Sequence, residues 1–207
     1  MSQAVAAHHE IAVDPAESPL TPESWGKLGM WVFLAGDAMS FGGLLAAYAA
    51  LRATSVDWPN PAAVLGISLT AAMTFLLICS SVTMVLSLEA IQHGDRSRFV
   101  RFMGLTVLGG IAFLGCQAYE WTHLIEAGLG LRHNPWGANL FGTTFFLTTG
   151  FHGCHVFAGV CYLTVVLIRG ATGKYNEHNW NEVEIAGLYW HFVDLIWILV
   201  FTFIYLV

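Results

Sequence analysis

Five long apolar runs follow one another along the chain, and they restrict the folds that it can adopt. A bilayer core is about 30 Å thick, so a helix needs about 20 apolar residues to cross it. Inside the bilayer every backbone polar group must also be hydrogen-bonded within the protein. The runs predict transmembrane helices over about 27–52, 62–91, 99–124, 136–169 and 184–207. We therefore expect an all-α integral membrane bundle of five helices over residues 25–207.

The composition agrees with a protein that lies in lipid. Hydrophobic residues make up 56% of the chain and charged residues 11%, whereas soluble domains carry roughly 25% charged residues. The net charge of -6 argues against nucleic-acid binding, because that function needs a basic surface. We expect no nucleic-acid partner.

The first 24 residues differ from the rest, since they are acidic and contain no Lys or Arg. They lack the basic start and the apolar stretch of a secretory signal. We expect residues 1–24 to form a disordered acidic tail, in which His8 and His9 are solvated and hold no metal.

The basic residues predict the orientation of the chain, because cytoplasmic loops retain Lys and Arg. With the N-terminus inside, six of them lie on the inner side and two on the outer side. The inner six are Lys27, Arg96, Arg98, Arg101, Arg169 and Lys174, and the outer two are Arg52 and Arg132. The sequence therefore predicts a cytoplasmic N-terminus.

A few polar side chains lie within the apolar runs, where ionisable groups are expensive. Asp37 lies near the middle of the first run. Three other runs each carry two polar residues three positions apart, which places both on one helix face. These pairs are Gln117 with Glu120, His152 with His155, and His191 with Asp194. We expect them to form a structural polar cluster that joins neighbouring helices.

Two chemical alternatives remain open for these residues. A carboxylate-bridged di-metal site needs two Glu-x-x-His motifs, and only Glu120 to His123 fits one. A bis-histidine haem site could use His152, His155 and His191, although nothing in their spacing requires it. The four cysteines form no C-x-x-C pair, and we expect them to be small core residues.

Several strings in this order and spacing resemble subunit III of cytochrome c oxidases. The segment from Gly29 to Phe41 resembles the family helix with a buried carboxylate, usually glutamate. Gln117-Ala118-Tyr119-Glu120 resembles the family's Q-x-x-E signature. The most specific strings are Phe151-His152-Gly153-Cys154-His155-Val156 and Trp190-His191-Phe192-Val193-Asp194 with Trp197. The chain resembles the short, five-helix form of the family.

This resemblance implies a subunit with no catalytic residue, metal or cofactor of its own, in a bacterial inner membrane. Haems and copper would lie on the partner subunits I and II, with subunit I as the main contact. It implies a V-shaped bundle whose cleft holds structural phospholipids, with Arg169 at a lipid phosphate and Asp37 and Trp31 on the helix that faces subunit I.

The implied roles are stabilisation of subunit I, lipid binding, and support of O2 access and proton uptake in a proton-pumping oxidase. Subunit III of a quinol oxidase is the alternative, and a stand-alone metal-binding membrane enzyme is a weaker one. Membership of a larger respiratory supercomplex is left open.

Overall fold

The computed structural model describes residues 25–207, which form five long helices and two short helical segments. The elements are α1 (Trp25–Thr54), α2 (Pro61–Val64), α3 (Ile67–Gln92), α4 (Arg96–Glu126), α5 (Asn139–Ala171), α6 (Asn181–Val200) and the π-helical η1 (Phe201–Leu206). Five spans, the last combining α6 and η1, are long and apolar enough to cross a membrane. The predicted all-α bundle of five membrane helices is confirmed. The predicted tail over 1–24, with His8 and His9, lies outside the described residues.

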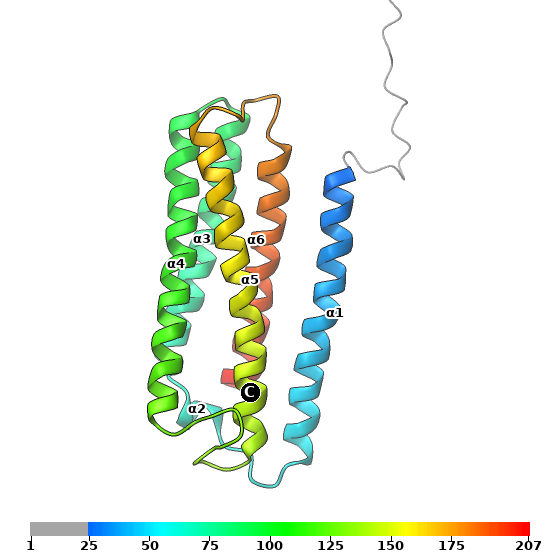
Figure 1. Cartoon of the computed structure of the whole chain (residues 1–207), viewed down its shortest axis with the longest axis vertical. Coiled ribbons are helices and arrows are strands. Elements are labelled where there is room, and N and C mark those ends of the chain that lie inside the picture. The colour runs from blue at the N-terminus through cyan, green and yellow to red at the C-terminus, as the bar shows by residue number, and fades with distance from the viewer. Residues whose placement is uncertain (1–24) are drawn as a thin grey trace, which may run out of the picture.

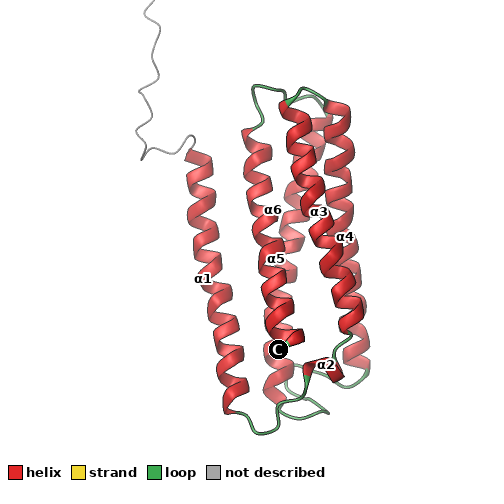
Figure 2. Cartoon of the chain, turned by 180° about the vertical axis from the view of Figure 1, so that it is seen from behind, coloured by secondary structure: helices red, strands yellow, loops and turns green. Residues whose placement is uncertain are grey.

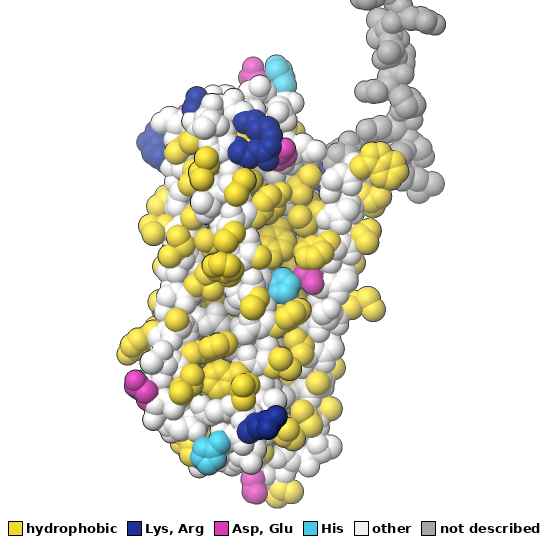
Figure 3. Space-filling model, in the orientation of Figure 1, with side chains coloured by type: hydrophobic (Ala, Val, Ile, Leu, Met, Phe, Trp, Pro, Cys, Tyr) yellow, Lys and Arg dark blue, Asp and Glu magenta, His cyan; other side chains and the backbone are white. Residues whose placement is uncertain are grey.

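Helices α3 to α6 pack on one another, while α1 lies at one side of the bundle against α6 and α5 (Figure 1). The reverse view shows the same separation of α1 from α3 and α4 (Figure 2). The starts of α1, α4 and α6 share one end of the bundle, which we call the inner end, and the opposite end is the outer end. On the face shown in Figure 3, most charged side chains lie toward these two ends, and the apolar band between them contains one carboxylate beside a histidine.

The second predicted helix begins five residues later than expected. Asn60 caps the four-residue α2, whose first residue is Pro61, and Leu65 then adopts an extended conformation with ψ of 145°. The long helix α3 starts only at Ile67. The predicted range of 62–91 was therefore wrong at its start, because one apolar run contains two helices and a break.

The fourth predicted helix was also wrong at its start, since α5 begins at Asn139 and not at residue 136. Gly137 has φ of 144°, a conformation that favours glycine. A Cβ atom there would lie 2.2 Å from the Asp57 carbonyl oxygen. The Ala138 N–H donates to the same oxygen at 2.9 Å, which joins the two outer loops.

Large aromatic side chains fill the interior, and glycines let the helices approach them. Trp190 and Trp197 of α6 are both wholly buried. A Cβ atom on Gly110 of α4 would lie 2.6 Å from the Trp190 ring, so this crossing requires glycine. The cysteines were wrongly expected in the core: Cys79, Cys154 and Cys161 are exposed, and only Cys116 is partly buried. Apolar periodicity does not separate these positions, because lipid-facing and core-facing residues are both apolar.

Candidate functional site

Asp37 of α1 faces His155 of α5 across a helix contact. The His155 Nε2 and Asp37 Oδ2 atoms are 3.0 Å apart, and each side chain is only 14% exposed. The rings of Phe41 and Phe151 pack on the imidazole, with centroids 5.3 and 4.7 Å away. The predicted buried carboxylate therefore has its partner within this chain.

The hydrogen bonds of His155 determine where the protons of this pair lie. His155 Nδ1 lies 2.8 Å from the Phe151 carbonyl oxygen. Because a carbonyl oxygen only accepts, Nδ1 must carry the hydrogen. A neutral imidazole then presents a lone pair on Nε2 toward Asp37. Attraction between the two groups needs one further proton, held either by the imidazole or by the carboxyl group.

Glu120 of α4 joins three elements near the outer end of the bundle. Thr70 of α3 donates to Oε1 at 2.8 Å, and Tyr205 of η1 donates to Oε2 at 2.9 Å. The Thr70 hydroxyl also lies 3.2 Å from the Gly66 carbonyl oxygen. If Glu120 carries a proton and donates to Thr70, Thr70 can donate to Gly66, and every group is satisfied.

Gln117 and His152 lie deeper in the contact between α4, α5 and α6. The Gln117 side-chain amide donates to the Thr149 carbonyl oxygen at 2.8 Å. His152 is 0% exposed and packs beside Phe113 and Trp197. Among residues 25–207 neither His152 ring nitrogen has a hydrogen-bond partner. Its contacts are therefore those of an aromatic core side chain.

His191 and Asp194 of α6 both turn toward Ser81 of α3. His191 Nδ1 is 2.5 Å from Ser81 Oγ, and the same serine lies beside the Asp194 carboxyl group, whose Oδ1 atom is buried without a hydrogen-bond partner among residues 25–207. Trp197, one turn beyond Asp194, donates to Thr74 of α3 at 3.0 Å. The α3–α6 contact is thus polar at two successive turns.

The six predicted cluster residues do not converge on one site. Five of them form separate polar contacts with α1, α3, α5 or η1. The ring of His152 makes no hydrogen bond to any residue in 25–207. In the described part of the chain no group of three His, Cys, Asp or Glu side chains is arranged to hold a metal ion. His123, the second half of the Glu-x-x-His motif, is exposed.

Arg169 pairs with a carboxylate of its own chain at the inner end. Its Nη1 is 2.9 Å from Glu182 Oε2, and both side chains are 42% exposed. Tyr175 donates to the same carboxylate at 2.6 Å, and Lys174 lies 3.4 Å from it. Burial and the adjacent Glu182 carboxylate raise the pKa of Tyr175 well above its ordinary value.

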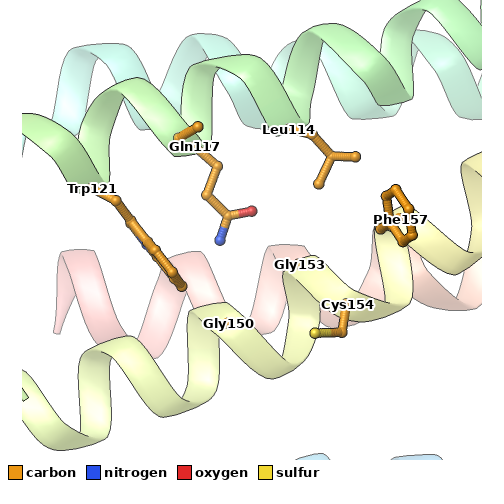
Figure 4. Close-up of a pocket in the computed structure, with 8 residues that line it drawn as sticks. Leu114, Gln117, Trp121, Gly150, Gly153, Cys154 and Phe157 are labelled. Atoms are coloured by element: carbon orange, nitrogen blue, oxygen red, sulfur yellow. The ribbon is translucent and has the colours of Figure 1, made fainter.

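Two apolar grooves run between membrane helices. One, of about 410 Å³, lies between α1 and α6 and includes Trp31 and His191 among its lining residues. The other, of about 320 Å³, lies between α4 and α5. Figure 4 shows Gln117 and Trp121 of α4 over Gly150 and Gly153 of α5 in this second groove.

Sequence reasoning missed the partners Thr70, Ser81, Tyr205 and Glu182. A hydroxyl inside an apolar run is common in membrane helices, so the run itself does not indicate which one faces a carboxylate. The sequence does indicate that Glu182 suits the first turn of α6, because a negative charge is favourable at the start of a helix. Its position beside Arg169 depends on the turn between α5 and α6.

Comparison with known proteins gives a consistent result over most of the chain. The family model for cytochrome c oxidase subunit III matches residues 21–207. The chain is 35% identical to cytochrome c oxidase subunit 3 of Corynebacterium diphtheriae over 201 residues, 96% of each protein. It is 38% identical to that of Thermostichus vulcanus over 198 residues, 95% of this chain and 92% of the relative. The Bacillus subtilis protein is 32% identical over 180 residues, 86% of this chain and 84% of the relative.

Proposed function

The chain belongs to the cytochrome c oxidase subunit III family, and we propose that it is the non-catalytic subunit III of a proton-pumping terminal oxidase in a bacterial inner membrane. Its main role is to stabilise subunit I, while subunits I and II carry the haems and copper. One observation supports this division of labour: the interior carboxylates Asp37 and Glu120 are both engaged by side chains of other helices.

The electron donor is cytochrome c in this proposal. The three relatives named above, which are 32% to 38% identical to the chain, bear the name cytochrome c oxidase subunit 3, and this name favours cytochrome c over a quinol as the donor. A copper-bearing subunit II in the purified complex would support the choice. A complex that oxidises quinol and lacks copper in subunit II would exclude it.

Phospholipid binding is the second part of the proposal. Arg169 lies at the inner end of α5, and its side chain is still 42% exposed beside Glu182. A planar guanidinium can bind a lipid phosphate with two N–H groups. Loss of copurified phospholipid from an Arg169→Ala oxidase would support this role, and an unchanged lipid content would remove it. Support of O2 access along lipid and of proton uptake at the inner end belongs to the same proposal.

The decisive experiment removes this subunit from the oxidase. We expect the remaining complex to keep its haem content and its initial rate, and to inactivate after fewer turnovers. Absorbance spectra of the purified complex give the haem content, and oxygen consumption over time gives the working life. Loss of the haem spectrum from an otherwise assembled complex would contradict the proposed division of labour.

A further inference from the structure

Arg169, Lys174 and Glu182 form a cluster of unequal charges at the inner end, which we call the inner charge cluster. Arg169 Nη1 lies 2.9 Å from Glu182 Oε2, and Lys174 donates to Glu182 Oε1 at 3.4 Å. These three side chains carry two positive charges and one negative charge. One positive charge therefore has no counter-ion within the cluster.

The neighbouring charged residues do not remove this excess. Lys27 and Glu184 pair with one another at 2.7 Å. Arg96 lies against the turn at Gly173, with Nη1 3.1 Å from the position of a Cβ atom there. Glu177 carries the opposite charge on the same inner loop. Because these four charges sum to zero, the excess positive charge belongs to the inner charge cluster.

Tyr175 holds the carboxylate in place and adds no charge. Tyr175 is 3% exposed and donates to Glu182 Oε2 at 2.6 Å. Burial and the adjacent carboxylate raise the pKa of Tyr175 above its ordinary value, so its hydroxyl stays neutral. The side chains of Arg169, Lys174 and Glu182 are between 41% and 42% exposed. The unpaired charge is therefore open to a ligand at the surface.

The depth of Arg169 indicates which anion can reach it. Helix α5 has 33 residues and Arg169 lies in its last turn. A helix of this length is about 50 Å long, whereas the hydrocarbon core is about 30 Å thick. The last turn thus lies among the headgroups, and Figure 3 shows Lys and Arg side chains gathered at this inner end. A guanidinium has five N–H donors, so it can bind a lipid phosphate and still contact Glu182.

We propose that the inner charge cluster selects a phospholipid with one net negative charge and binds its phosphate through Arg169 and Lys174. The phosphate of such a lipid brings the total charge of cluster and headgroup to zero. A headgroup that also carries an ammonium group leaves the excess charge in place. This inference rests on the proposed function, which places a phospholipid at Arg169, and it adds the class of headgroup and the residues that select it.

The test lets the full oxidase choose between two headgroups. The tagged complex is stripped of loosely bound lipid and equilibrated with mixed micelles of equal parts phosphatidylglycerol and phosphatidylethanolamine. It is then repurified, and its lipids are quantified by mass spectrometry. The lipid bound at the cluster is the difference between the unaltered and the Arg169→Ala complex. We expect about fivefold more phosphatidylglycerol in that difference, because one unit of charge near lipid headgroups is worth about 1 kcal/mol.

Two variants change the charge of the cluster in opposite directions. Lys174→Gln lowers it to zero, and the headgroup preference should disappear. Glu182→Gln raises it to two, and the preference should rise to about twenty-fivefold. Arg98→Gln is the matched control, since it also removes one positive charge at the inner end, but its guanidinium lies over the Phe102 ring at 5.8 Å. It should keep the preference of the unaltered complex. An equal fall in Lys174→Gln and Arg98→Gln would overturn the proposal, as would a preference for phosphatidylethanolamine in the unaltered complex.

The remaining outcomes separate this proposal from the proposed function. If the tagged chain copurifies with no oxidase subunit, the proposed function fails. If Arg169→Ala retains as much lipid as the unaltered complex, phospholipid binding at Arg169 fails. If that lipid is lost but the headgroup ratio does not follow the charge of the cluster, only the headgroup selection fails. Displacement of the bound phosphatidylglycerol by inorganic phosphate, and not by chloride at equal ionic strength, would make the cluster a site for free phosphate and overturn the lipid proposal.

Discussion

Replacing His155 by leucine should destabilise the protein more than replacing Asp37 by asparagine. Because His155 Nδ1 donates to Phe151, a neutral ring offers a lone pair at Nε2. In Asp37→Asn the side-chain amide can donate to that lone pair, so no extra proton is needed. In His155→Leu the carboxyl group of Asp37 loses its partner in an apolar region.

The size of the difference follows from the burial of the pair. Removing one partner of a fully buried ion pair costs about 3–5 kcal/mol. Asp37 is 14% exposed and therefore not fully buried, so the cost of losing its partner should be closer to that of one unmet hydrogen bond, at about 1–3 kcal/mol. We expect about 2 kcal/mol for His155→Leu and less than about 1 kcal/mol for Asp37→Asn. The double variant Asp37→Leu with His155→Leu should be more stable than His155→Leu alone, since both polar groups are gone.

Thermal melting of the purified protein in detergent, followed by loss of helical circular dichroism, measures these differences. For a chain of this size about 1 kcal/mol shifts the melting temperature by about 2–4 °C. His155→Leu should therefore melt about 4–8 °C lower, and Asp37→Asn less than about 4 °C lower. An Asp37→Asn protein that melts as low as His155→Leu would refute the assignment of the shared proton.

Three further changes test other contacts by the same melting measurement. Tyr205→Phe leaves one oxygen of Glu120 without a donor and should cost about 1 kcal/mol; an unchanged melting temperature would mean that this contact is not formed. Tyr175→Phe should lower stability equally at pH 6 and pH 9, because burial raises the pKa of the Tyr175 hydroxyl in the folded protein. The contribution of this hydroxyl to stability is therefore lost only above about pH 10, where the unfolded tyrosine ionises. A smaller loss of stability at pH 9 than at pH 6 would contradict this. Gly110→Ala places a Cβ atom 2.6 Å from Trp190 and should cost about 1–3 kcal/mol, whereas Gly115→Ala, with nothing within 4 Å, should cost nothing.

The five membrane helices could be predicted because hydrocarbon imposes one requirement on all of them, which is a run of apolar residues long enough to cross it. Helix starts were harder. Asn60-Pro61 is a helix-start signal inside a loop, but nothing local indicates that this helix ends at Val64. At Gly137 the positive φ follows from a contact with Asp57, which is eighty positions away in the chain.

The polar residues could be located from the sequence, but their partners could not. Helical spacing places Gln117 and Glu120 on one face of α4, yet the first contacts α5 and the second contacts α3 and η1. Residues three positions apart still differ by about 60° around the helix axis, which is enough to direct them toward different neighbouring elements. His152 and His155 separate in the same way, toward the core and toward α1.

The attachment of α1 depends on polar contacts at three depths. Lys27 pairs with Glu184 at 2.7 Å at the inner end, Asp37 meets His155 further along the helix, and the Tyr48 hydroxyl lies 3.5 Å from the Ile204 carbonyl oxygen near the outer end. Apolar contact between helices gains little in lipid, because lipid chains are as apolar as leucine. These contacts therefore hold α1 in register along α5 and α6.

These contacts also change which predicted residues are available to a neighbouring subunit. Asp37 is engaged by His155 at 3.0 Å, and Arg169 is paired with Glu182 at 2.9 Å. Trp31 is different, since it is 55% exposed and lines the α1–α6 groove. A shorter carboxylate at position 37 is thus compatible with an internal contact, and of these three residues only Trp31 leaves most of its side chain without a partner in the described part of the chain.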